Sequence, residues 1–275
     1  MDAKQKINNI LVLKKALLRN IIDSAYFAGA SSAHIGGALS SVDIVSTLFS
    51  EFIKINKANF EKTERDYFIL SKGHACLVYY AVLAEIGFFS RDQLKLFEKS
   101  DSFLLGHPIL NKKYGIDFST GSLGMGLSIG VGVALALKKK NTNHKVYVLV
   151  GDGECNEGSI WEASMSAAHF KLDNITAIID NNNLQQTGSN EEIMSSADLG
   201  SKWRSFNWDV IEIDGHNIEQ ILKAFNHVSD RPKLILAKTL KGKGFRFAEN
   251  NNDWHHKIMT KKQYEEALIE LDNAE

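Results

Sequence analysis

Apolar residues recur at helical spacing along the first part of the chain. Between residues 5 and 29 they fall three or four positions apart, a period that predicts an amphipathic helix. Similar patterns predict helices over 42–54, 74–87 and 90–99. A short apolar run over 67–70 predicts a strand between the second and third of these helices. The pattern therefore predicts helices around a single strand in this region.

The second half of the chain alternates between β-branched runs and helical patterns, and a final helix is predicted from Thr260. Because strands that alternate with helices form parallel sheets covered on both faces, we expect an α/β fold with about five or more parallel strands. Two connecting segments, 183–195 and 241–257, are long enough to suggest function. The predicted strands of this half lie near 145–150, 175–180, 208–213 and 233–239.

Composition leaves this picture unchanged and narrows the class of protein. The 275 residues are 44% hydrophobic and 24% charged, with a formal net charge of −1, so we expect one soluble domain without a nucleic-acid or membrane partner. The N-terminus leads into an amphipathic pattern and not a signal-peptide core, so a cytoplasmic location is expected. Cys76 and Cys155 form neither a disulfide scaffold nor a metal-binding spacing.

Two polar residues, Asp152 and Asn182, each follow one of these predicted strands. If a helix over 157–170 joins the strands, a right-handed crossover brings both strand ends to the edge where open α/β sheets bind ligands. A carboxylate and an amide oxygen suit Mg²⁺, which takes few protein ligands and completes its octahedron with water and phosphate. The pair therefore predicts a phosphate-bearing cofactor. An ordinary strand–turn–helix with Asp152 as N-cap is the alternative.

Glycines occur around this site and in one earlier run. Gly151 and Gly153 would let the backbone turn and approach a diphosphate at a helix N-terminus. The run over 121–132 has the wrong spacing for a dinucleotide fingerprint and follows no strong strand. We expect Gly130 and Gly132 to let a buried helix pack closely against a neighbour.

Four histidines lie in turn-like contexts near glycines: His34, His74, His107 and His255. A single such histidine is more often structural than functional, but four in loops indicate a site. Asp152 and Asn182 with their flanking residues resemble the Gly-Asp-Gly to Asn-Asn segment of thiamine-diphosphate enzymes. The histidine contexts resemble transketolases, and the likeness runs from about residue 20 to 260. The segments that carry it are 33–36, 71–74, 106–108, 120–124, 151–182 and 254–257.

The resemblance implies a thiamine-diphosphate-binding fold of the diphosphate-binding (PP) type and assigns roles to particular residues. The metal ligands would be Asp152, Asn182 and the backbone carbonyl of Leu184. The residues that contact the cofactor would be His74, Gly121, Leu123, Gly151, Gly153, Asn182 and His255, with Gly121 and Leu123 facing the aminopyrimidine through their backbones.

Catalytic roles follow from the same resemblance. His34, His107 and His255 would line the substrate channel and donate hydrogen bonds to substrate hydroxyls and to the developing alkoxide. Glu157 would belong to a carboxylate network at the dimer interface. Two residues depart from the family pattern: Ile35 replaces a proline, and His256 replaces a glycine.

The resemblance also implies a partner, since the transketolase pyrimidine-binding and C-terminal domains have no counterpart in residues 1–275. We expect a split transketolase whose C-terminal subunit supplies them, in an assembly such as a heterotetramer with two copies of each chain. Such an enzyme transfers a two-carbon ketol unit from a ketose, expected to be phosphorylated, to an aldose. The alternatives are a subunit of a 2-oxo acid dehydrogenase E1 or of a deoxyxylulose-phosphate-synthase-like enzyme, or a non-catalytic scaffold subunit. The sequence does not identify the sugars.

Overall fold

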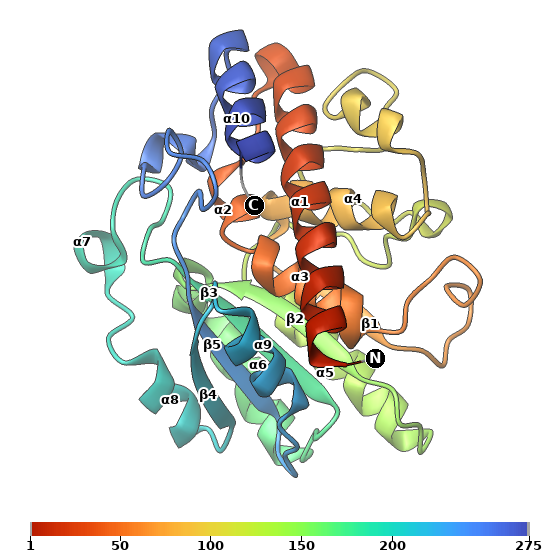
Figure 1. Ribbon diagram of the computed structural model, residues 1–275. Helices are drawn as coiled ribbons and strands as arrows, with labels where there is room; N and C mark the ends of the chain where they lie inside the picture. The colour runs from red at the N-terminus through yellow and green to blue at the C-terminus, as the bar shows by residue number, and fades with distance from the viewer. Residues whose placement is uncertain (1, 274–275) are drawn as a thin grey trace. The chain divides into compact units, whose positions relative to one another are not determined.

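The computed structural model describes residues 2–273 and contains two compact units (Figure 1). The first, called the sheet unit here, comprises residues 53–73 and 120–239. The second, called the helical unit, comprises the described residues of the other three segments, up to 52, 74–119 and from 240 onward. The sequence-based expectation of one domain stays a prediction.

The sheet unit is built on five parallel strands in the order β1-β2-β3-β5-β4. This confirms the predicted α/β fold, and each strand lies within a residue or two of its predicted position. Parallel sheets are buried on both faces, which explains the nearly continuous apolar runs. The strands are β1 (Tyr67–Leu70), β2 (Val146–Gly151), β3 (Ile175–Asn181), β4 (Asp209–Asp214) and β5 (Lys233–Lys238).

Helices cover both faces of this sheet. Helix α5 packs against β1, β2 and β3 and against α6. The step from β4 back to β5 reverses the direction of strand addition, so a right-handed crossover puts α9 on the face opposite α6. Figure 1 shows α9 in front of the sheet. The helices of the unit are α5 (Met125–Lys139), α6 (Gly158–His169), α7 (Asn190–Met194), α8 (Leu199–Ser205), α9 (Ile218–Asn226) and the 3₁₀ turn η5 (Gly153–Asn156).

One of the two glycines expected to permit close helix packing does so. A Cβ on Gly130 would lie 2.6 Å from Cγ2 of Val148, so the missing side chain lets α5 approach β2. The expectation for Gly132 was wrong. A Cβ there would meet nothing within 4 Å, because this face of the helix is exposed.

The helical unit is organised around its first helix, α1, which packs against α3, α4, η3 and α10. Tyr26 of α1 stacks on Tyr264 of α10 with ring centroids 4.2 Å apart. An antiparallel bridge between Ala33 and Lys257 joins two loops. The helices are α1 (Ala3–Ala28), α2 (Gly36–Leu39), α3 (Val42–Glu51), α4 (Cys76–Glu85) and α10 (Lys261–Asn273), and the 3₁₀ turns are η1 (Gly29–Ser31), η2 (Gly73–Ala75), η3 (Arg91–Leu96), η4 (Lys112–Tyr114) and η6 (Asn252–His255).

One predicted helix differs from expectation. The helix predicted over 90–99 is a 3₁₀ helix that ends at Leu96, because Phe97 turns to an extended conformation and is buried. The two long connections, 183–195 and 241–257, contain α7 and η6.

None of the helices within residues 2–273 combines the length and apolar character needed to cross a membrane.

Candidate active site

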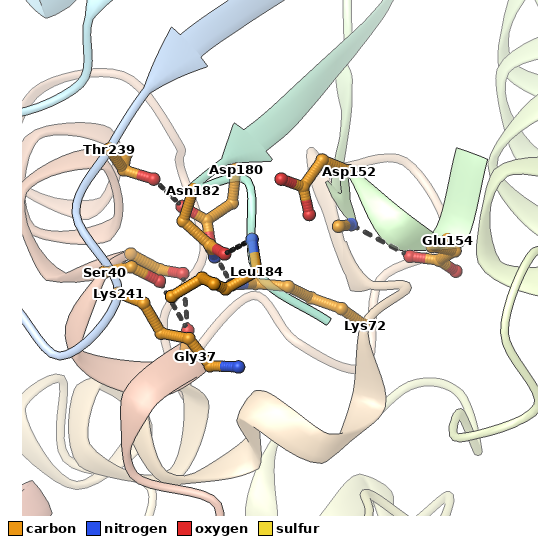
Figure 2. Close-up of polar contacts among 12 residues, drawn as sticks. Gly37, Ser40, Lys72, Asp152, Glu154, Asp180, Asn182, Leu184, Thr239 and Lys241 are labelled. Carbon is orange, nitrogen blue, oxygen red and sulfur yellow. Dashed lines mark hydrogen bonds and ion pairs between the residues drawn. The ribbon is translucent and has the colours of Figure 1, made fainter. Parts of the chain in front are cut away.

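Asp152 and Asn182 meet at one edge of the sheet unit, as the strand pattern predicted. Strands β2 and β3 are parallel neighbours in which Gly151 pairs with Asp180, so the residues that follow each strand emerge side by side. Figure 2 shows Asp152 beyond β2, with its carboxylate directed toward the end of β3, where Asn182 and Leu184 lie. All of these residues belong to the same unit.

The Asp152 carboxylate is held by backbone groups. Its Oδ1 accepts a hydrogen bond from the N–H of Gly153 at 2.8 Å, and its Oδ2 accepts one from the N–H of Asn183 at 2.6 Å. Burial, with the nearby charge of Asp180, raises the pKa of Asp152 to about 6, although these N–H groups and the side chain of Asn190 oppose the rise. A buried carboxylate with a raised pKa is a group whose ionised form a cation would stabilise.

The segment after β3 folds around Asn182. Its Oδ1 accepts a hydrogen bond from the N–H of Leu184 at 3.1 Å, and its Nδ2 donates to Oδ2 of Asp180 at 3.0 Å. The Asp152 carboxylate and the Asn182 amide oxygen therefore lie at the ends of neighbouring strands, which fits the oxygen preference of Mg²⁺. Within the described residues no three His, Cys, Asp or Glu side chains could hold a metal ion, so a cation here would also need amide or backbone oxygens.

A buried ion pair supports this segment and was missed by the sequence analysis. Nζ of Lys72 lies 2.5 Å from Oδ2 of Asp180, and both side chains are at most 2% exposed. Thr239 donates its hydroxyl to Oδ1 of the same carboxylate, also at 2.5 Å. Asp180 therefore ties the end of β1 and the end of β5 to Asn182. The only sequence signal was a charged residue inside an apolar strand.

Glu154 is a second buried carboxylate that sequence reasoning missed. Its Oε1 accepts hydrogen bonds from the hydroxyl of Ser71 at 2.5 Å and from the N–H of Gly124 at 2.7 Å. Its Oε2 accepts one from the N–H of Gly151 at 3.0 Å. Burial raises the pKa of Glu154. The side chain thus joins the loop after β2 to the loops that precede α4 and α5.

Backbone segments approach closely at the glycines of the site. A Cβ on Gly73 would lie 2.7 Å from the backbone nitrogen of Gly121, so a side chain there would push the two loops apart. Gly121 itself has φ 142°, and Leu123 is 38% exposed. A Cβ on Gly153 would lie 2.9 Å from Cγ of Gln185. Three of these positions were predicted to bind the cofactor through the backbone: Gly121, Leu123 and Gly153.

Two other predicted residues have different surroundings. Gly151 lacks a positive φ, and a Cβ there would make only ordinary contacts at 3.8 Å, so neither its conformation nor its space requires glycine. Glu157 is exposed just ahead of α6, at a surface of the sheet unit. An exposed position is compatible with an interface role but does not test it.

The predicted histidines gather in the helical unit around His34. The centroid of its ring lies 5.7 Å from those of His74 and His107 and 5.4 Å from that of His255. His256, which was not predicted to act, lies nearest at 4.2 Å. The rings of His74 and His255 are stacked, 5.3 Å apart. We call these five residues the histidine cluster.

His34 at the centre of the cluster is held neutral. Burial, together with His256, His255, His107 and Lys241, lowers the pKa of His34 to about 3. Burial likewise lowers the pKa of His107, against the charge of Glu98. A neutral imidazole carries one donor and one acceptor, which suits recognition of sugar hydroxyls.

Lys241 is a further residue that the sequence analysis missed. It is 1% exposed, and its Nζ donates to Oδ1 of Asn252 at 2.7 Å and lies 3.1 Å from Nδ1 of His255. An ammonium donor at Nδ1 puts the proton of a neutral His255 on Nε2. A Cβ on Gly36 would lie 3.0 Å from Cγ of Lys241, which explains the need for glycine there.

Known proteins resemble this chain over most of its length. The family model for the transketolase thiamine diphosphate binding domain matches residues 15–270. A protein named as one of the subunits of apulose-4-phosphate transketolase, from Phocaeicola vulgatus, is 41% identical over 88% of this chain and 87% of its own. A 6-deoxy-6-sulfo-D-fructose transketolase subunit from a Clostridium species is 38% identical over 87% of this chain and 88% of its own.

Solved structures agree with the sequence relatives. Transketolase from Leishmania mexicana superposes with a TM-score of 0.87 and 25% identity over 96% of this chain. This chain spans 41% of that protein, whereas it spans most of the relatives named as subunits. The predicted fold and the predicted likeness to the N-terminal subunit of a split transketolase are confirmed. The chain belongs to the transketolase family and corresponds to its thiamine diphosphate binding domain.

Proposed function

We propose that the chain is the N-terminal subunit of a split transketolase, which transfers a two-carbon ketol unit from a ketose to an aldose with thiamine diphosphate and Mg²⁺. The observation that supports this most is the pairing of β2 with β3, which brings Asp152 and Asn182 to one sheet edge. The match to a thiamine diphosphate binding domain identifies the cofactor in this proposal. The carboxylate and amide oxygens at the strand ends are the reason for including Mg²⁺.

The sheet unit binds the cofactor in this proposal. Asp152, Asn182 and the carbonyl of Leu184 hold the metal, while Gly151 and Gly153 present backbone to the diphosphate. Gly121 and Leu123 face the aminopyrimidine with their backbones. When bound, thiamine diphosphate supplies the carbon nucleophile that attacks the ketose carbonyl. Lys72 and Asp180 act indirectly, because their ion pair orients Asn182.

The helical unit acts on the substrate. His34 and His107 donate hydrogen bonds to sugar hydroxyls and to the ketose oxygen as negative charge develops on it. His255, whose proton is directed to Nε2 by Lys241, donates toward the same oxygen and the diphosphate. His74 contacts the diphosphate. Glu157 contributes to a carboxylate network at a subunit interface.

A separate C-terminal subunit completes the enzyme, most simply as a heterotetramer with two copies of each chain. Relatives that are themselves named as transketolase subunits support the existence of a partner subunit. Their names also suggest donors for this chain, namely apulose 4-phosphate or a sulfonated ketose. The 2-oxo acid enzymes and a scaffold role are less well supported, since those relatives are named as transketolases. The cytoplasmic location stays a prediction.

Reconstitution tests the function. The purified chain, alone and mixed with a candidate C-terminal subunit, would be assayed for ketol transfer with saturating Mg²⁺ and thiamine diphosphate. The donors would be apulose 4-phosphate and the ketose phosphates bound in solved transketolases, fructose 6-phosphate, xylulose 5-phosphate and sedoheptulose 7-phosphate. We expect turnover only with both chains. Robust turnover by the chain alone would show that the split-enzyme proposal is wrong.

A further inference from the structure

His256 is the member of the histidine cluster that the proposed function leaves without a task. It is an exposed residue just after η6, where the family pattern stated above has a glycine. Its ring centroid lies 4.2 Å from that of His34, closer than any of the three other rings measured against His34. The His256 side chain, which a glycine at this position would lack, therefore contacts the imidazole of His34 directly.

A strained serine anchors this ring. Ser32 has φ 56°, a conformation that disfavours residues other than glycine, asparagine and aspartate. Its Oγ lies 2.9 Å from Nε2 of His256 and 3.4 Å from Nδ1. The hydroxyl hydrogen of Ser32 is already donated to the carbonyl of Ser31 at 2.6 Å. Oγ therefore acts as the acceptor for His256, which puts the ring proton on Nε2, the nearer nitrogen.

This tautomer has a chemical consequence. With its proton on Nε2, the His256 ring has an unprotonated Nδ1, which is a hydrogen-bond acceptor. The proposed function uses His34, His107 and His255 as hydrogen-bond donors, so an acceptor on His256 gives the cluster the complementary group. The partner that fits an exposed imidazole acceptor is a hydroxyl group of the sugar.

We propose that His256 is a specificity-determining residue for the ketose: it packs against His34 and accepts a hydrogen bond from a substrate hydroxyl, while Ser32 holds its ring in place. This inference rests on the proposed ketol transfer. A group that hydrogen-bonds one hydroxyl favours ketoses that present a hydroxyl at that position, because the other ketoses leave the imidazole to water. His256 accordingly narrows the range of donors more than it accelerates any one reaction.

The test compares the reconstituted wild-type complex with His256→Gly, using the four donors named above. We expect the spread of kcat/KM among the donors to shrink by roughly two- to tenfold, the range for one hydrogen bond that water can replace. Thiamine diphosphate affinity should stay within about twofold of wild type, as expected for a residue outside cofactor binding. Ser32→Ala, which keeps the ring but removes its anchor, should shift selectivity in the same direction by a smaller factor.

Two further variants serve as a partial rescue and as a control. His256→Asn restores an acceptor without the ring that packs against His34 and should recover part of the selectivity. His144→Gly, in the turn before β2, removes a histidine far along the chain and should change nothing. Equal changes in kcat/KM for all four donors in His256→Gly, or no change, would overturn the proposal.

A measurement without turnover separates this inference from the proposed function. If the wild-type complex transfers no ketol unit, ketol transfer fails, but the placement of His256 can still be tested by NMR of histidine rings in the chain. We expect His256→Gly to shift the His34 signals, and fructose 6-phosphate or apulose 4-phosphate to shift the His256 signals of wild type. Unchanged His34 signals would contradict the contact between the two rings, and unchanged His256 signals with both sugars would contradict the hydroxyl contact.

Discussion

The oxygen-rich strand ends of the sheet unit and the histidine cluster of the helical unit are built in opposite ways. Asp152, Glu154 and Asp180 are each at most 3% exposed, and each accepts at least two hydrogen bonds. In the cluster, His107 and His256 are exposed and His34 is only partly buried. Hydrogen bonds hold the carboxylates of the sheet unit in place without a ligand. The histidine cluster, in contrast, has rings at the surface that a substrate can contact.

This difference predicts different consequences of substitution. Changes among the buried carboxylates should affect cofactor binding or stability, because each substitution removes the acceptor of several buried donors. Changes among the exposed rings should affect turnover or selectivity while the fold survives. The following experiments test this expected difference between the two regions.

The largest effect is expected for Asp152→Ala. We expect thiamine diphosphate affinity in the presence of Mg²⁺ to fall by at least about 100-fold, since loss of even a supporting partner of a metal ligand costs 10–100-fold. Calorimetry on the reconstituted complex would measure it, and chelation of Mg²⁺ should lower wild-type affinity to a similar level. Asp209→Ala, at the opposite end of a strand, is the matched control. Unchanged affinity in Asp152→Ala would refute the metal assignment.

Lys72→Met tests the buried ion pair. Removing the ammonium leaves Asp180 buried without its cation, which should cost about 3–5 kcal/mol of unfolding free energy. Denaturant unfolding of the chain would measure the loss. Lys138→Met is the control, because the Lys138–Asp173 pair is 40% and 47% exposed and should be worth about 1 kcal/mol or less. Similar losses in both variants would contradict the expectation that burial determines how much each ion pair contributes to the free energy of unfolding.

Alanine substitutions of three histidines divide the cluster by role. His34→Ala and His107→Ala should lower turnover by roughly ten- to a thousandfold, as expected for lost donors to a developing oxyanion, with cofactor affinity within a few-fold. His74→Ala should mainly weaken cofactor binding. Steady-state kinetics and cofactor titration of the three complexes would separate these effects. Equal losses of cofactor affinity in all three would remove the distinction.

The smallest effect concerns acid stability. The pKa of His34 is about 3 in the folded chain, against about 6.5 for an unperturbed histidine, so the unfolded state binds more protons between these values. Stability should therefore fall as pH falls from 6.5 toward 3. His34→Gln, which cannot be protonated there, should lose less stability over this window than wild type. Thermal unfolding at pH 7 and pH 4.5 would show it, and an identical pH dependence would contradict a neutral, buried His34.

Much of this contrast could be predicted from local sequence. The strands follow from apolar runs, and the convergence of Asp152 and Asn182 follows from the handedness of one crossover. The four histidines were recognisable because each lies in a short loop motif. The partnership of Lys72 with Asp180 was not, because the two residues are 108 positions apart and no local pattern links them. Glu154 was missed for a similar reason, since two of its donors, the Ser71 hydroxyl and the Gly124 N–H, are 83 and 30 positions away.

The position of Asp180 also has a consequence for biosynthesis. Its carboxylate is completed by Lys72 from the end of β1 and by Thr239 from the segment after β5. Contacts between residues so distant in the chain form late, because each closes a long loop. During translation, a ribosome-bound chain that has not yet extended past Thr239 lacks one of the donors that orient Asn182. We therefore expect newly made chains to orient Asn182 only after the segment that carries Thr239 has been synthesised.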